Sequence, residues 1–275
     1  MYATDFKYDD KRLSDYNCII CDFDATLGIS FVSIGSKIAF TTQAAGKGKK
    51  YTLIDTNYDE CLGCTFDICK NPDLYNGDEM EMSATEYREI IRWLNRKEFL
   101  PLVFLATGEI EGINSCYYDA SFNVSKIEIA GKVYGLRVDM TTNRPFGYGT
   151  KKSSVLSFSQ SDYKETKNVD YISDEIGYCY PDIEIKCKAE GTLVIKNTTA
   201  NSTTQIKNCL FDEIINLKGE EMIITSSKPH KTLSNDFNYT FLRLINTLTQ
   251  TENNITVSLP CEITISYAPI IKDAP

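Results

Sequence analysis

Two aspartates near the N-terminus, Asp22 and Asp24, have a spacing that phosphoryl-transfer chemistry uses. They follow the apolar run Cys18–Cys21 and are followed by Thr26. A carboxylate directly after an apolar strand can attack phosphorus, and a second carboxylate two residues later can act as general acid beside a bound Mg²⁺. The pattern therefore gives one candidate for a catalytic site.

This stretch resembles the first motif of the haloacid dehalogenase superfamily, with Asp22 as nucleophile and Asp24 as general acid. Further residues can be fitted to its later motifs: Thr107, Lys151 or Lys152, and Asp170 with Asp174. That fold, however, needs a parallel sheet with a helix between successive strands. Residues 28–80 offer glycine, threonine, lysine and β-branched residues without a helical stripe. We therefore expect the two aspartates to flank a strand-to-turn junction, and we keep the phosphatase as an alternative only.

Cysteine and histidine offer little support for other chemistry. Two CxxC pairs, Cys18 with Cys21 and Cys61 with Cys64, could together form a four-thiolate zinc site. In a strand, however, side chains at i and i+3 point to opposite faces. We expect reduced thiols and no metal. The single histidine, His230, lies in a polar loop, and no glycine-rich phosphate loop is present, so we expect no cofactor and no enzyme.

Composition indicates a folded protein whose main role is not to bind nucleic acid phosphates. The 275 residues are enough for one large or two ordinary domains, and 42% of them are hydrophobic. The net charge of −9 argues against phosphate-backbone binding as the main role, although it would suit a lumen past which DNA slides. The polar start Met1–Lys7 lacks an apolar signal core, and no apolar run is long enough for a membrane span.

One strong helix signal begins at Ser83. Its hydroxyl can accept a bond from the first turn, and Glu86 can reach back to the Ser83 N–H, which makes a capping box. An apolar stripe at i, i+3, i+4 and i+7 follows: Tyr87, Ile90, Ile91 and Leu94. We expect this helix to pack across a sheet of the N-terminal half.

Most of the remaining chain has strand and turn patterns. Residues 34–42 and 51–55 flank the basic segment 43–50, which predicts a long hairpin with an exposed tip, or one ordered by a partner. A second hairpin is predicted within residues 117–140, turning at Gly131. Residues 150–154 are the best linker candidate. The segment after them has short strands about ten residues apart, typical of a β-sandwich, and only a weak helix signal at 241–248.

Several short sequence segments, and the order in which they occur, resemble those of one known family. The segments are Phe66–Pro72, Arg92–Phe99, Thr142–Gly149, Ser173–Tyr178, Asn235–Tyr239 and Pro260–Tyr267. The family is the distal tail proteins of long-tailed phages of Gram-positive hosts, with similar prophage tail components. The resemblance covers almost the whole chain.

The resemblance implies a structural virion protein at the tail tip, assembled in the host cytoplasm. It implies a homo-hexameric ring between the major tail tube protein and the tail-associated tip protein, with DNA passing only through the lumen and no membrane insertion. Residues 1–150 would form the ring, as a β-sandwich with one packed helix and an extended hairpin. Residues 151–275 would form an outward-facing galectin-like β-sandwich to which receptor-binding or baseplate proteins attach. The expected fold class is thus mainly β, with minor α.

The basic hairpin tip is our candidate for a ring or tube contact, through Lys47, Lys49 and Lys50. A carbohydrate-binding module for host adsorption is the second alternative function. In related proteins the outer domain sometimes recognises sugars, but this sequence shows no matched tryptophan platform.

Overall fold

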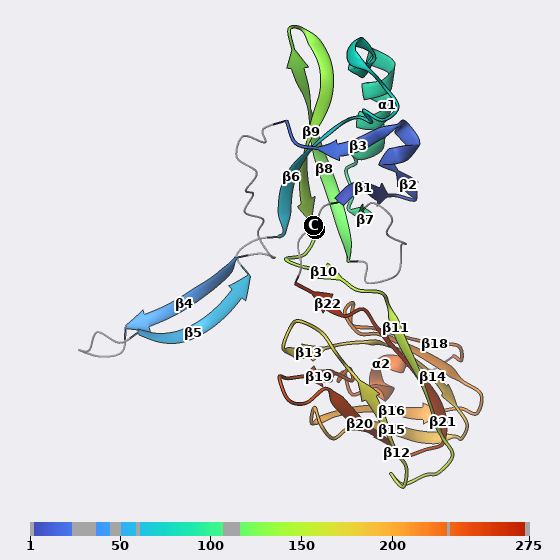
Figure 1. Cartoon of the computed structure of the whole chain (residues 1–275). Coiled ribbons are helices and arrows are strands. Elements are labelled where there is room, and N and C mark those ends of the chain that lie inside the picture. Colours follow the sequence, from blue (N-terminus) through green and yellow to red (C-terminus); the bar gives the residue numbers. More distant parts are fainter. Residues whose placement is uncertain are drawn as a thin grey trace. The chain divides into compact units, whose positions relative to one another are not determined.

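The computed structural model describes residues 3–23, 37–44, 51–58, 61–106, 116–229 and 232–272. The chain forms two compact units: unit 1 contains Met1–Thr150 with Ile271–Pro275, and unit 2 contains Lys151–Ile270. Strands make up most of both units (Figure 1), so the predicted, mainly β fold class is confirmed.

Among the described residues, nine strands form one sheet: eight lie in unit 1, and the short β22 contains the boundary between the units, at Ile270 and Ile271. Their bounds are β1 Ala3–Tyr8, β2 Lys11–Arg12, β3 Cys18–Cys21, β6 Gly63–Lys70, β7 Leu100–Ala106, β8 Tyr117–Ile129, β9 Lys132–Thr142, β10 Gly147–Tyr148 and β22 Ile270–Ile271. The order is β2-β1-β7-β8-β9-β6-β3, and β10 pairs with both β8 and β22. Short 3-10 helices, η1 (Leu13–Tyr16) and η2 (Gly77–Met80), lie in the connections.

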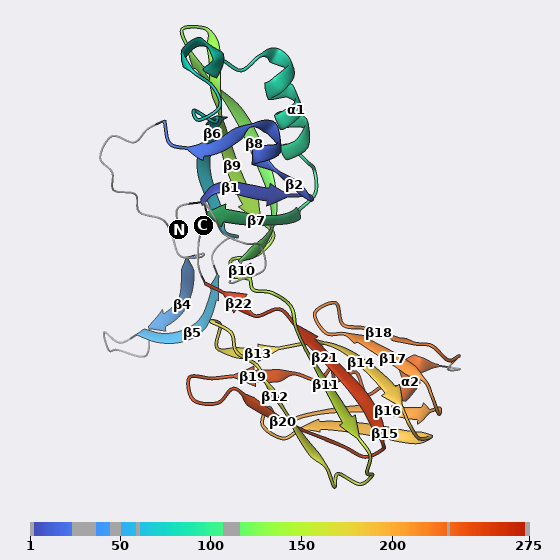
Figure 2. The same ribbon diagram turned by 45° about the vertical axis from the view of Figure 1, so that its right-hand side comes forward.

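The sheet of unit 1 curls until its two ends face each other (Figures 1 and 2). Strands β7, β8 and β9 separate β1 from β6 in the sheet order, yet the rings of Phe6 on β1 and Phe66 on β6 lie 5.7 Å apart. Phe104 and Phe122 join the same aromatic core. One curled sheet therefore encloses the core of unit 1, where the resemblance to distal tail proteins implied a β-sandwich.

Helix α1 (Ala84–Leu94) begins at the predicted capping box. The Glu86 N–H donates to Ser83 Oγ at 3.3 Å, and the Ser83 N–H donates to Glu86 Oε2 at 2.7 Å. The helix buries Ile90, Trp93 and Leu94 in the core that the curled sheet encloses. The predicted packing of this helix on an N-terminal sheet is confirmed.

Trp93 fixes the helix to strand β1. Its indole N–H donates to the Tyr8 carbonyl oxygen at 3.0 Å, so the buried polar atom is satisfied. Its ring stacks on Phe6 at 5.5 Å and on Tyr16 at 5.0 Å. Because these partners come from β1 and η1, this contact closes the N-terminal segment over the core.

Strands β8 and β9 form the predicted hairpin that turns at Gly131. The two turn residues, Ala130 and Gly131, have φ values of 52° and 80°. Two consecutive positive φ angles give the turn type whose twist matches that of paired strands.

A bidentate ion pair joins β9 to β6. Arg137 Nε lies 2.9 Å from Asp67 Oδ1, and Arg137 Nη2 lies 3.0 Å from Asp67 Oδ2. The two residues are direct cross-strand partners, and Asp67 is only 4% exposed. A buried carboxylate depends strongly on such a partner.

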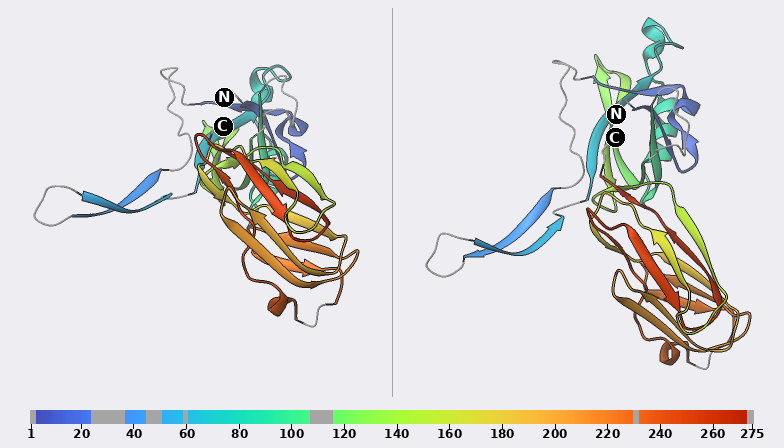
Figure 3. Two further views of the ribbon diagram at one scale, coloured as in Figure 1. Left: turned by 90° about the horizontal axis from the view of Figure 1, so that it is seen from below. Right: turned by 60° about the horizontal axis from the view of Figure 1, so that its bottom comes forward.

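Unit 2 consists mainly of two antiparallel sheets (Figure 3). One sheet has the order β11 (Lys152–Phe158), β21 (Cys261–Tyr267), β14 (Asp182–Cys187), β17 (Ile214–Lys218) and β18 (Ile223–Ser226). The other has the order β12 (Thr166–Asp170), β20 (Glu252–Val257), β15 (Gly191–Asn197) and β16 (Ser202–Cys209). A further pair is β13 (Gly177–Cys179) with β19 (Leu244–Asn246).

The two larger sheets of unit 2 share one hydrophobic core. Ile183 and Ile185 from the first sheet are buried with Leu193 and Ile195 from the second. The predicted β-sandwich is therefore present. The weak helix signal at 241–248 was wrong: this segment contains β19, and its side chains Phe241, Leu242 and Leu244 enter the sandwich core. The short helix α2 lies earlier, at Leu233–Asp236.

Arg137→Met is expected to lower the free energy of unfolding of unit 1 by about 2 kcal/mol, because it leaves the Asp67 carboxylate buried without its cation. The cost is smaller than for a fully buried pair, since the Arg137 side chain is 41% exposed. Trp93 fluorescence during urea unfolding measures it, because the chain's only tryptophan lies in unit 1. The double variant Asp67→Leu/Arg137→Met should regain most of the loss. An unchanged Arg137→Met midpoint would contradict this role.

Candidate functional site

The strand pair β4 (Ile38–Ala44) and β5 (Tyr51–Tyr58) forms a two-stranded sheet of its own within unit 1 (Figure 1). The strands are antiparallel, from Ile38 opposite Tyr58 to Ala44 opposite Tyr51, with a bulge between Thr41 and Thr42. All described side chains from Phe40 to Asn57 are exposed. The predicted long hairpin is therefore present, and it has water on both faces.

The two faces of this hairpin differ sharply in polarity. Cross-strand partners share a face, so the register separates two sets. One face, here called the apolar hairpin face, carries the large side chains Ile38, Phe40, Tyr51, Leu53 and Tyr58 together with Thr42, Ala44 and Thr56. The polar hairpin face carries Ala39, Thr41, Gln43, Thr52, Asp55 and Asn57.

Large side chains on the apolar hairpin face are more than half exposed. The exposed fractions are 64% for Phe40, 68% for Tyr51 and 53% for Leu53. Full burial of one such side chain contributes roughly 1.5–3 kcal/mol. Large apolar side chains gathered on one exposed face are typical of an interaction site, and a two-stranded hairpin alone is only marginally stable in water.

The root of the hairpin is held by contacts within unit 1. The Tyr58 ring meets Phe146 edge to face at 5.7 Å, and Lys272 Nζ lies 5.8 Å from the centroid of the Tyr58 ring. On the polar hairpin face, Asn57 Nδ2 donates to Asp55 Oδ2 at 2.7 Å. The anchored root and the uncovered outer part together make this hairpin the leading candidate for an assembly contact.

The three lysines that the sequence analysis selected, Lys47, Lys49 and Lys50, lie outside the described residues. They belong to the segment that joins Ala44 to Tyr51. Their contact with a ring or tube neighbour stays a prediction. The sequence analysis missed the apolar hairpin face, although the alternation of Ile38 and Phe40 with smaller or polar neighbours could have indicated it.

The surroundings of Asp22 do not fit the phosphatase alternative. Asp22 directly follows β3, and β3 pairs antiparallel with β6, whereas that enzyme fold needs parallel strands. A cavity of about 190 Å³ beside Asp22 is lined by apolar side chains, Tyr134 and the thiols of Cys21 and Cys69. None of its described lining residues carries the positive charge that a phosphate would need.

The other residues fitted to the phosphatase motifs give that alternative no support. Asp24 and Thr107 lie outside the described residues, as does the single histidine, His230. Lys151, Lys152, Asp170 and Asp174 belong to unit 2, whereas Asp22 belongs to unit 1.

The cysteines of the two CxxC pairs are not assembled into a metal site. Within the described ranges, no group of three or more histidine, cysteine, aspartate or glutamate side chains could hold a metal ion. Burial raises the pKa of Cys18 to about 12 and that of Cys64 to about 11. A hydrogen bond between Cys21 and Cys69 raises the pKa of Cys21 and lowers that of Cys69.

Two family models match the chain. The model described as a phage tail protein N-terminal domain matches residues 1–144, and the model described as a phage tail C-terminal domain matches residues 146–267. No curated protein matches the chain significantly in sequence. Of the helices described, none has the length and hydropathy needed to span a bilayer.

A solved structure has a similar fold. The crystal structure of the Dit (gp 19.1) protein of phage SPP1 is described as a paradigm of the hub adsorption apparatus in phages that infect Gram-positive hosts. It superposes with a TM-score of 0.65 over 98% of this chain and 99% of that chain, at 11% sequence identity. At this identity the likeness shows the fold alone.

Thiol labelling of the native protein should modify Cys61 first, because it is exposed, while Cys18 and Cys261 are buried. Burial raises the pKa of Cys18 and of Cys261 to about 12, so the reactive thiolate fraction of these two thiols at pH 7 is roughly 10⁻⁵. Mass spectrometry after a short reaction with a thiol-specific reagent measures the order. Cys61→Ser should remove the fast phase. Rapid modification of Cys18 or Cys261 without denaturant would contradict the conclusion that these two thiols are buried and protonated.

Proposed function

The chain belongs to the phage tail protein family whose N-terminal and C-terminal domain models match it, and we propose that it is the structural hub of a phage tail tip. The resemblance of its sequence to distal tail proteins is confirmed by this family and by a fold similar to that of SPP1 Dit. In the proposed role the chain positions and contacts other tail proteins, and it catalyses no reaction.

The apolar hairpin face is the observation that carries this proposal. An outer face built from Phe40, Tyr51 and Leu53 is unfavourable in water, and unit 1 already has a complete core without it. A second copy of the chain is the proposed cover. If every copy lays its hairpin on the next copy, the contact is heterologous, and it forms a ring when the rotation between neighbouring copies closes after a full turn. Six copies are the number that the resemblance to distal tail proteins implies.

The net charge of the chain supports a place around the DNA path. At −9 per copy, a ring of six would carry strong negative charge, and like charges prevent DNA from adhering to a lumen wall. The proposed neighbours are the major tail tube protein on one side and the tail-associated tip protein on the other. The tip lysines, Lys47, Lys49 and Lys50, remain candidates for the contact with a ring or tube neighbour.

Unit 2 is proposed to be the attachment domain. It folds as a separate sandwich with its own core, which suits a domain that carries receptor-binding or baseplate proteins. Its galectin-like character stays a prediction. The proposed location is the tail tip of the virion, after assembly in the host cytoplasm.

The mass of the purified protein in solution tests the ring. Six copies of 31.1 kDa give about 187 kDa, which light scattering separates easily from a monomer. Negative-stain imaging of the same chromatographic peak should show rings with a central hole. A protein that stays monomeric both alone and when mixed with its tube and tip proteins would contradict the proposal.

Variants of the two hairpin faces test the interface itself. Phe40→Ser/Leu53→Ser is expected to leave a monomer, because it removes the surface that the neighbour would cover. The matched control on the polar hairpin face, Thr41→Ser/Thr52→Ser, should assemble normally. Since all four side chains are exposed, the thermal midpoint of each variant should stay close to that of the parent. Full-sized rings from Phe40→Ser/Leu53→Ser would exclude this face as the contact.

A further inference from the structure

Two thiols lie side by side on one face of the unit 1 sheet. Strand β3 is the last strand of this sheet, and within the described residues it pairs with β6 alone (Figure 1). The register places Cys21 opposite Asp67 and Ile19 opposite Cys69. Cross-strand partners share a face, as do alternate residues of one strand, so Cys21 and Cys69 are diagonal neighbours on one face. The opposite face, which carries Cys18, is buried in the core.

An open cavity gives small molecules access to this pair. It is the cavity of about 190 Å³ beside Asp22, and both thiols line it. Cys21 is partly exposed, and Cys69 is 8% exposed. The remaining lining residues include Phe23, Met80, Ile129 and Tyr134. The two sulfur atoms are therefore within reach of a reagent as small as a peroxide, whereas a bulky labelling reagent meets the exposed Cys61 first.

A hydrogen bond between the two thiols makes them chemically unequal. Cys21 donates and Cys69 accepts, so this bond lowers the pKa of Cys69 and raises that of Cys21. Burial and the Asp67 carboxylate oppose the lowering of the pKa at Cys69. The thiolate, not the thiol, is the nucleophile. Cys69 is therefore the sulfur that reacts first, and Cys21 is the neighbouring thiol that can complete a disulfide.

A second pair of hydrogen-bonded thiols lacks such access. Cys187 and Cys209 lie in the sandwich core of unit 2, and they are 3% and 1% exposed. Neither residue lines the cavity beside Asp22. The chain thus contains one thiol pair with contact and access and another with contact but no access, which provides an internal reference.

We propose that Cys21 and Cys69 form a dithiol site at which hydrogen peroxide converts the two thiols into a disulfide. The Cys69 thiolate attacks one peroxide oxygen and the O–O bond breaks, so Cys69 becomes a sulfenic acid and hydroxide leaves. The hydroxide takes up the proton that Cys69 had lost and becomes water. The Cys21 sulfur then attacks the Cys69 sulfur, and the sulfenic hydroxyl leaves with the Cys21 proton as a second water molecule. Two thiols and one peroxide thus give one disulfide and two water molecules.

The disulfide fastens the edge strand β3 to β6. The two strands are held together by four residue pairs, of which Cys21 with Asp67 is the last. The cross-link closes the long segment of chain between Cys21 and Cys69, which restricts the unfolded state. The site goes beyond the hub role, because ring assembly does not require it. Its use rests on the proposed function, since a tail protein is made in a reducing cytoplasm and acts in an oxidising medium after release.

Peptide mass spectrometry of the full chain after brief treatment with hydrogen peroxide tests the site. Alkylation of the remaining thiols and digestion should yield a peptide linked through Cys21 and Cys69, with Cys187 and Cys209 alkylated. The matched control Cys61→Ser lacks an exposed thiol outside the cavity and should form the same link. The thermal midpoint of unit 1, followed by Trp93 fluorescence, should rise by about 5 °C or more on oxidation and return with a reducing agent.

Single variants test the order of attack. In Cys21→Ser the sulfenic acid on Cys69 has no neighbouring thiol, so it should persist and be trapped by dimedone. In Cys69→Ser, Cys21 should stay unlabelled, because burial and the carboxylates of Asp67 and Asp22 oppose its ionisation even without the hydrogen bond.

The proposal is overturned if the native chain forms no Cys21–Cys69 link, or if Cys187 and Cys209 are oxidised equally fast. Equal dimedone labelling of Cys21 in Cys69→Ser and of Cys69 in Cys21→Ser would overturn it as well. Light scattering of the reduced protein measures ring formation separately, so a failure of this site and a failure of the hub proposal are distinguishable.

Discussion

A two-stranded hairpin cannot bury either of its faces by itself, and this constraint governs what the N-terminal unit can do. Strands β4 and β5 leave Phe40, Tyr51 and Leu53 in water on one side and polar residues on the other. The hairpin root is held by Tyr58 against Phe146. Such an element is stable only when something else covers its apolar side. The proposed function follows from the need for another molecule to cover the apolar hairpin face.

The rest of unit 1 is complete without the hairpin. The curled sheet brings Phe6 and Phe66 together from its two ends, and Trp93 closes the helix over them with a hydrogen bond to Tyr8. Stability and the proposed assembly contact are therefore carried by different residues. Side chains of the hairpin can change with the partner while the core stays unchanged, an arrangement that suits a protein whose role is to connect others.

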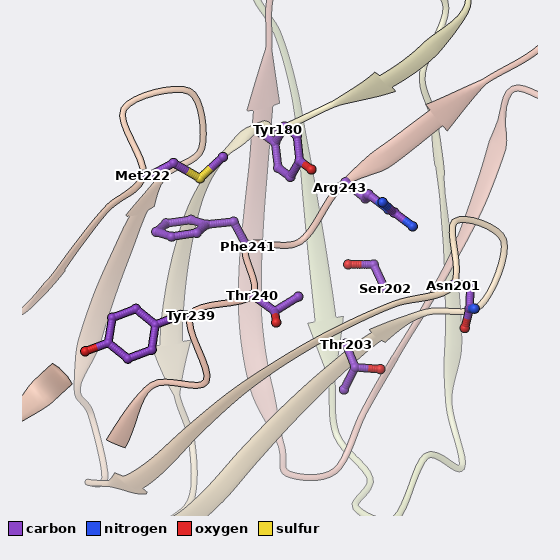
Figure 4. A pocket seen from close by; sticks show the side chains of 9 residues that line it. All are labelled: Tyr180, Asn201, Ser202, Thr203, Met222, Tyr239, Thr240, Phe241 and Arg243. Carbon is purple, nitrogen blue, oxygen red and sulfur yellow. The ribbon is translucent and has the colours of Figure 1, made fainter. Parts of the chain in front are cut away.

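Local signals in the sequence predicted local structure well. The Ser83 capping box, the turn at Gly131 and the strand spacing of the second half each involve residues close in sequence, and each is confirmed. Non-local features could not be predicted, because pairing β6 with β9, or curling the sheet, depends on contacts between distant segments. The helix signal at 241–248 was wrong, since a short apolar run fits a buried coil and strand equally well. A pocket of unit 2 (Figure 4) combines four segments that are distant in sequence, at Tyr180, Ser202, Met222 and Tyr239, so local patterns could not predict it either.

Hydrogen exchange of the hairpin in the assembled and dissociated protein tests the central claim most directly. The account predicts that amides of residues 38–44 and 51–58 exchange quickly in the monomer and about tenfold or more slowly in the ring, because a neighbouring copy then covers the apolar hairpin face. Amides of β8 and β9 provide the internal reference, since their hairpin belongs to the core sheet in both states. Equal exchange of the β4–β5 amides in monomer and ring would contradict the account.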